Sequence, residues 1–237
     1  MNDLGGKLVI AIDGPSGSGK STTSIGVAAR LGLRYLDTGA MYRAATCAFL
    51  EAGVDPSDSA GVIRCTVEAD LQISTDPLEQ WVRVNGRDVT LAIREPEIST
   101  RVSAISTLAE CRENLVARQR AIIEDTGSGI VAEGRDITTV VAPDAAVRLL
   151  LTADPQIRMA RRKRELGEKV DDAGIADQVL RRDRDDSKLV NFTEAADGVV
   201  ELDCSYLTLE ETIAAVLSLV RRLAPEFVPA LGEQAHG

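Results

Sequence analysis

Histidine is nearly absent from this chain of 237 residues, which contains only His236. A Ser-His-Asp triad, a Cys-His protease and a His-ligated metal centre all need an imidazole that is held in ordered structure. His236 is next to last in the chain, in a short, proline-punctuated segment (225–237) that we expect to be a flexible tail. The composition therefore excludes these reaction classes.

Paired cysteines and long apolar runs are also missing. The four cysteines, none in a C-x-x-C spacing, are Cys47, Cys65, Cys111 and Cys204. Neither a disulfide framework nor a zinc site is expected, and such thiols are typical of a reduced, cytoplasmic protein. No stretch approaches the run of about 20 apolar residues that a membrane span needs, and the first residues lack a signal-peptide pattern. We expect a cytoplasmic protein without a membrane partner.

Positive charge is scarce overall, because the net charge is −10 at pH 7. Nucleic acid is therefore not an expected partner, since Lys and Arg supply most of the affinity for phosphate backbones. Arginines nevertheless bunch at 158–164 and 181–184. These bunches are either solvated helix faces with salt bridges or places where a small anion is held.

Strand and helix patterns alternate along the chain, which favours an α/β fold with a doubly wound parallel sheet in three α/β/α layers. Apolar strands are predicted at 7–13, 34–37, 129–134, 145–151 and 198–203. Helices are predicted at 20–31, 38–52, 97–125 (in one or two pieces), from 155, at 175–186 and from about 209. Residues 71–90 alternate apolar and polar around Asn85-Gly86, a hairpin signal, so a small antiparallel insertion interrupts this order. A polar, glycine-containing loop is expected at 167–174.

A phosphate-binding loop follows the first strand in the stretch DGPSGSGKST, residues 13–22. Gly14, Gly19, Lys20 and Ser21 satisfy G-x-x-x-x-G-K-[ST] between a strand and a helix, where the backbone N–H groups cradle phosphate and the helix dipole adds positive potential. Lys20 is expected to reach the β and γ oxygens, and the Ser21 hydroxyl to ligate Mg²⁺. The predicted ATP-binding residues of this loop are Gly14, Pro15, Ser16, Gly17, Ser18, Gly19, Lys20, Ser21 and Thr22.

Such a loop occurs in small-molecule kinases, GTP-driven switches and mechanical ATPases. The guanine-reading N-K-x-D is absent, and the nearest string, Asn85 to Asp88, lies in the hairpin. A mechanical ATPase usually has a longer chain and partner surfaces. A kinase instead needs an acceptor site, and bunched arginines suit an anionic acceptor because the planar guanidinium grips phosphate in bidentate fashion.

Four segments, GPSGSGKST, YLDTGAMYR, VAEGRDITTVV and RRDRDDS, occur in this order from the first strand toward the last helix. Together they resemble the bacterial cytidylate kinases, a family of P-loop nucleoside monophosphate kinases. The resemblance implies phosphorylation of CMP and dCMP by ATP with Mg²⁺. It also implies one kinase domain (1–224) with a core (7–37 and 128–224), a monophosphate-binding insertion (38–127) and a helical lid (155–186).

The resemblance also implies a role for individual residues. The CMP pocket would be lined by Thr38, Tyr42, Arg43, Glu133, Arg135 and Asp136, with Arg43 and Arg135 on the phosphate. Ser103 and Arg112 would read the cytosine edge, Arg182 and Asp186 would contact the ribose, and Lys188 would lie close to them. The lid arginines closing over ATP would be Arg158, Arg161 and Arg162. Charge on the transferred phosphoryl group would be neutralised by Lys20, Arg135, Arg158 and Arg162.

Several of these residues also have plain structural interpretations. Arg112 fits a surface arginine of a helix, Ser103 an ordinary helix hydroxyl, and Tyr42 a core side chain. Asp37 fits a helix N-cap, so we leave it out of the catalytic set.

The chain departs from the family pattern at three places. Lys188 stands where an arginine is usual, Phe192 and Thr193 replace a proline and a leucine, and Thr138 replaces a glycine. A lysine lacks the fork of arginine, so this departure bears on base and sugar selectivity and not on the reaction type. The alternatives are another small P-loop kinase, for adenylate, shikimate or a related acceptor, and a nucleotide-sensing P-loop protein without a small acceptor. Short loops and the lack of a heptad seam favour a monomer.

Overall fold

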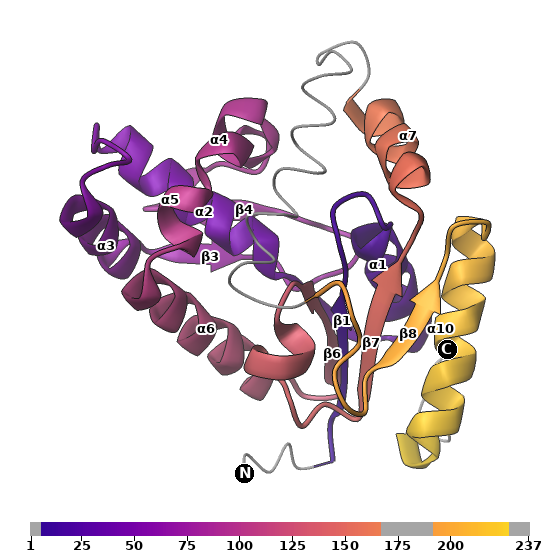
Figure 1. The fold of residues 1–237 in the computed structure, drawn as a ribbon. Coiled ribbons are helices and arrows are strands. Elements are labelled where there is room, and N and C mark those ends of the chain that lie inside the picture. Colours follow the sequence, from indigo (N-terminus) through magenta and orange to yellow (C-terminus); the bar gives the residue numbers. More distant parts are fainter. Residues whose placement is uncertain (1–5, 167–191, 228–237) are drawn as a thin grey trace. The chain divides into compact units, whose positions relative to one another are not determined.

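The computed structural model describes residues 6–166 and 192–227. The chain divides into two compact units (Figure 1). One consists of Met1–Leu36 and Ile123–Gly237, and the other is the single stretch Asp37–Ile122.

A five-stranded sheet forms the centre of the first unit, in the order β2-β6-β1-β7-β8. Its strands are β1 (Leu8–Asp13), β2 (Arg34–Asp37), β6 (Gly129–Gly134), β7 (Val147–Thr152) and β8 (Val200–Asp203). β1 pairs in parallel with β6 on one side and with β7 on the other, and β7 pairs in parallel with β8. Every residue of β1 and β6 is buried, as expected for apolar runs covered on both faces. The predicted α/β fold with a parallel sheet is confirmed.

Two helices of this unit pack on the sheet through one apolar cluster. α1 (Lys20–Leu31) contributes Val27, and α10 (Leu209–Leu223) contributes Val216 and Val220, beside apolar residues of β1 and β7. α10 begins with a capping box in which the side chains of Thr208 and Glu211 bind each other's backbone N–H. Residues whose apolar spacing predicted this closing helix, Val216 and Val220 among them, therefore pack into the core.

Shorter elements complete the first unit. Residues Ile137–Val141 form a π-helix, η2, that the sequence patterns did not predict. α7 (Pro155–Leu166) begins where Asp154-Pro155 predicted a helix start. Pro225–Phe227 form a 3₁₀ turn, η5, whose Phe227 packs against the cluster between α1 and α10. The loop expected at 167–174 and the helix expected at 175–186 lie outside the described residues.

The second unit contains the predicted antiparallel insertion, a sheet of β3 (Leu71–Ile73), β4 (Val82–Val84) and β5 (Arg87–Asp88). Asn85 and Gly86 join β4 to β5 with φ angles of 50° and 79°, as a two-residue hairpin turn requires. The remaining elements are α2 (Thr38–Glu51), α3 (Ser59–Glu68), η1 (Ala92–Arg94), α4 (Pro96–Arg101), α5 (Ser103–Ser106) and α6 (Ala109–Glu124). α3 was not predicted, and the helical region 97–125 is divided into three helices.

The four cysteines are free thiols, and Cys47, Cys111 and Cys204 are buried. Burial raises the pKa of the Cys47 thiol to about 11. Across residues 6–166 and 192–227, none of the helices has the length and apolar character that crossing a membrane requires.

The start of β6 requires a glycine, which gives a test of the β1–β6 pairing. Gly129 has φ of +131°, and a Cβ there would lie 2.2 Å from the backbone oxygen of Leu8. We expect Gly129→Ala to lower the free energy of unfolding by about 1–3 kcal/mol, because two backbones must move apart. Gly127→Ala is the control, since a Cβ at Gly127 meets nothing within 4 Å, and its change should stay within about 0.5 kcal/mol. Equal urea midpoints for the two variants would contradict this account.

Candidate active site

The phosphate loop joins the end of β1 to the start of α1, as predicted. Gly19 is the N-cap of α1 with φ of 90°, a left-handed conformation that glycine adopts without strain. Within the described residues, no side chain caps this helix start, and the first turn has no acidic residue. The Thr22 hydroxyl donates to the Gly19 carbonyl at 2.9 Å. The start of α1 thus has the amide and dipole arrangement that binds anions.

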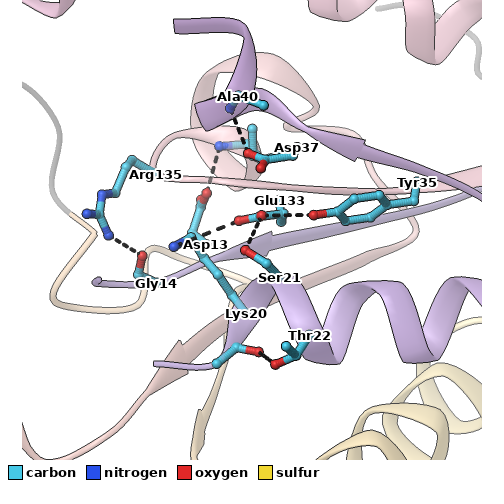
Figure 2. A network of polar contacts seen from close by, with 12 residues as sticks. Asp13, Gly14, Lys20, Ser21, Thr22, Tyr35, Asp37, Ala40, Glu133 and Arg135 are labelled. Atoms are coloured by element: carbon cyan, nitrogen blue, oxygen red, sulfur yellow. Dashed lines mark hydrogen bonds and ion pairs between the residues drawn. The ribbon is translucent and has the colours of Figure 1, made fainter. Parts of the chain in front are cut away.

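Glu133 lies beside this loop, near the end of β6, and its side chain is 2% exposed. The Ser21 hydroxyl donates to Glu133 Oε1 at 2.6 Å, and the Tyr35 hydroxyl donates to the same oxygen at 3.1 Å (Figure 2). Lys20 Nζ lies 3.8 Å from Glu133 Oε2. A buried carboxylate is stable only with such partners, so Glu133 and the lysine and serine of the loop form one polar cluster.

Asp13, the last residue of β1, holds the start of the π-helix. Its carboxylate accepts hydrogen bonds from the N–H groups of Ile137 and Thr138, each at 2.9 Å, and from the Thr138 hydroxyl at 2.6 Å. Burial raises the pKa of Asp13 above its ordinary value, although these hydrogen bonds and the charge of Lys20 act in the opposite direction. Thr138, where the family usually has glycine, therefore ties the segment after β6 to the base of the phosphate loop.

Arg135 lies between the loop and a buried aromatic ring. Its Nη1 donates to the Gly14 carbonyl at 2.5 Å (Figure 2). The guanidinium carbon lies 4.5 Å from the centroid of Phe192, whose side chain is buried, at a distance typical of a cation–π contact. Asp136 follows as the buried N-cap residue of the π-helix. Phe192 was noted in the sequence only as a departure from the family, and the structure shows that it supports Arg135.

Arginines of α7 donate hydrogen bonds to backbone carbonyl oxygens of the phosphate loop. Arg158 donates to the Ser16 carbonyl at 3.0 Å, and Arg161 donates to the Ser18 carbonyl at 3.1 Å. Arg162, on the same helix, is half-buried. The structure thus brings Lys20, Ser21, Glu133, Arg135, Arg158 and Arg161 together around the phosphate loop.

Five further predicted acceptor residues, Thr38, Tyr42, Arg43, Ser103 and Arg112, lie in the second unit. Thr38 is the first residue of α2 and is buried, whereas Tyr42 and Arg43 are half-buried on the same helix. Asp37 accepts from the Ala40 N–H at 2.8 Å and pairs with Arg43 at 3.0 Å, so the predicted N-cap is confirmed.

Ser103 is exposed at the start of α5, and Arg112 is half-buried on α6. Arg182, Asp186 and Lys188 lie outside the described residues.

The match to a family model agrees with this geometry. The model described as "Cytidylate kinase" matches residues 10–222. The chain belongs to the cytidylate kinase family. A cytidylate kinase of Cutibacterium acnes is 53% identical over 214 residues, which cover 90% of this chain and 96% of that protein. Cytidylate kinases of Corynebacterium glutamicum and Streptomyces avermitilis are 45% and 42% identical, over 92% and 90% of this chain and 96% and 92% of theirs. Cytidylate kinases are phosphotransferases, which confirms the enzyme class that the family resemblance implied.

Sequence reasoning gave no role to Asp13 or Tyr35, two residues of the polar network around the phosphate loop. Tyr35 is the first residue of the segment YLDTGAMYR, but its partner Glu133 lies on a separate strand that the segment does not reveal. Asp13 could have been singled out from its position. It stands directly before the first glycine of the loop, at the end of an apolar strand where a charge is costly to bury.

The network around Asp13 predicts a dependence of stability on pH. We expect Asp13→Asn to lower the free energy of unfolding by about 2 kcal/mol at acidic pH, because the amide nitrogen cannot accept the hydrogen bonds that a carboxyl oxygen accepts. The folded protein binds the Asp13 proton more tightly than the unfolded chain, so the stability contributed by this carboxyl is greatest below its ordinary pKa of 3.8 and is lost as pH rises. The stability difference between the unsubstituted protein and the variant should therefore shrink from acid toward neutral pH in urea unfolding. A difference that widens with pH would contradict the raised pKa.

Proposed function

We propose that this chain transfers the γ-phosphoryl group of ATP to CMP and dCMP, giving ADP and CDP or dCDP. The observation that carries the proposal is the cluster of Lys20, Ser21 and Glu133 on the phosphate loop of a chain that belongs to the cytidylate kinase family. The loop amides and the Lys20 ammonium suit the phosphates of the donor.

Ser21 and Glu133 have the chemistry that Mg²⁺ needs. The Ser21 hydroxyl donates its hydrogen to Glu133 at 2.6 Å. The lone pairs of Ser21 Oγ therefore remain available for a metal ion. P-loop enzymes hold Mg²⁺ with the loop hydroxyl and a carboxylate on a neighbouring strand, together with phosphate oxygens. We assign Mg²⁺ to Ser21 and Glu133, where it would neutralise charge between the β and γ phosphates.

The acceptor phosphate is assigned to Arg135 and Arg43. A guanidinium carries five N–H donors, so Arg135 can keep the Gly14 carbonyl and also hold a phosphate. Thr38, Tyr42, Glu133 and Asp136 would complete the pocket, with Ser103 and Arg112 on the cytosine. Arg182 and Asp186 would contact the ribose, and Lys188 would stand in place of an arginine that helps to recognise the base.

No strong general base is needed, because the acceptor is a phosphate oxygen that is already ionised near neutral pH. Alignment of the two nucleotides and neutralisation of charge would supply most of the acceleration. Lys20 and Arg135 are assigned to that charge. Arg158 and Arg161 hold loop carbonyls, so among the α7 arginines we assign the same role to Arg162.

An acceptor panel tests this function. Coupled assays of ADP release should give the highest kcat/KM with CMP and dCMP, lower values with UMP, and the lowest with AMP. Lys20→Ala should lower kcat by about 10²- to 10³-fold for every acceptor, since a cation on the transferred group is lost. Arg221→Ala, at an exposed site on α10, is the control and should match the unsubstituted enzyme. A higher kcat/KM with AMP or UMP than with CMP would show that the base assignment is wrong.

The role of Arg112 is tested by selectivity rather than by rate. Arg112→Met should reduce the preference for CMP over UMP by about tenfold, as expected for one lost hydrogen bond to a charged group. Steady-state kinetics with both acceptors measure this ratio. If kcat/KM fell equally with CMP, UMP and AMP, Arg112 would not read the base.

A further inference from the structure

Backbone oxygens on the outside of the phosphate loop are bound by arginines. A loop whose N–H groups converge on an anion turns its carbonyls outward, and those oxygens need donors of their own. Here the carbonyls of alternate residues accept from guanidinium groups: Gly14 from Arg135 at 2.5 Å, Ser16 from Arg158 at 3.0 Å, and Ser18 from Arg161 at 3.1 Å.

Arg161 has the most extensive of these contacts. Its Nη2 donates to the Cys204 carbonyl at 2.7 Å, and its Nη1 lies 3.4 Å from Cys204 Sγ. The Cys204 thiol is 1% exposed and lies 3.1 Å from both the Ser18 carbonyl and the Thr152 carbonyl. A guanidinium of α7 and a thiol that follows β8 therefore meet at Ser18, and the single S–H of the thiol is shared between the Ser18 and Thr152 carbonyls.

Arg158 anchors α7 at the same place. Its side chain is 7% exposed, and its Nε donates to the Ala153 carbonyl at 3.2 Å while Nη1 holds Ser16. The backbone of α7 also lies against the loop, since a Cβ on Gly17 would be 2.7 Å from the Arg158 carbonyl. The first turns of α7 are thus packed on the outer side of the loop.

We propose that Arg161, together with Cys204 and Arg158, positions the phosphate loop for ATP by fixing its carbonyls outward before the nucleotide binds. This inference rests on the proposed function only in taking the loop as the ATP site. A loop that already has its amides turned inward loses less freedom when phosphate arrives, so these residues strengthen ATP binding without contacting ATP. They are positioning residues, in contrast to the direct contact with ATP that the family resemblance implies for Arg158 and Arg161.

Hydrogen exchange in the absence of nucleotide separates the two roles. In Arg161→Met, amides of residues 14–22 should exchange about tenfold faster, as expected when one hydrogen bond of a charged donor is lost. KM for ATP should rise by a similar factor, whereas KM for CMP should change less than about twofold, because the acceptor is held elsewhere. Mass spectrometry of the loop peptide and steady-state kinetics measure these quantities.

Arg164→Met is the matched control, since Arg164 is exposed on the same helix and should leave both readouts unchanged. If Arg161→Met raised KM for ATP while the loop exchanged at its original rate, Arg161 would contact ATP directly and the proposal would be overturned.

Cys204 gives a second variant in case Arg161→Met does not fold. Cys204→Ala removes one donor from Ser18 and should also speed exchange of the loop, whereas Cys204→Ser keeps a donor and should restore most of the protection. Unchanged exchange in Cys204→Ala would count against the proposal. Because exchange is measured without substrates, a failure of the CMP assignment would leave this result intact.

Discussion

The parallel pairing of β1 with β6 is the constraint on which the site depends. Its register runs from Leu8 opposite Gly129 to Asp13 opposite Gly134. The phosphate loop, which follows β1, and Arg135, which follows β6, therefore start at the same end of the two strands. The pairing also brings Glu133 within reach of Ser21 and Lys20. A shift of one residue in β6 would turn Glu133 to the opposite face of the sheet and separate all three. The burial of both strands on both faces opposes such a shift.

The sequence predicted the features that are local. Each strand of the parallel sheet, the phosphate loop and the Asn85-Gly86 turn has its signal within a few residues. α3 was missed although Asp58, a residue type that favours the N-cap position, accepts from the Gly61 N–H at 3.0 Å. The π-helix over 137–141 has no local signal, since a run of β-branched residues favours a strand, and Asp13 holds it from a distant part of the chain.

Contacts between distant segments could not be predicted from one sequence. The family resemblance implies a pocket role for Glu133 but does not give its partners. Its hydrogen bonds with Ser21 and Tyr35 depend on which strands are neighbours. The bunched arginines had two interpretations, a solvated helix face or an anion site. Arg158 and Arg161 instead donate to loop carbonyls. The positions of charged residues in the sequence do not distinguish this role from a solvated face or an anion site. Arg182, Asp186 and Lys188 remain predictions.

The second compact unit is inserted as one uninterrupted stretch, Asp37–Ile122, whereas the first is built from two segments. Residues assigned to reading the base, Ser103 and Arg112, belong to the inserted stretch, and the residues of the phosphate loop belong to the other unit. Two genetic crossovers are therefore enough to exchange the whole stretch between relatives. If Ser103 and Arg112 read the base as proposed, such an exchange would carry their part of the base preference without changing the phosphate loop.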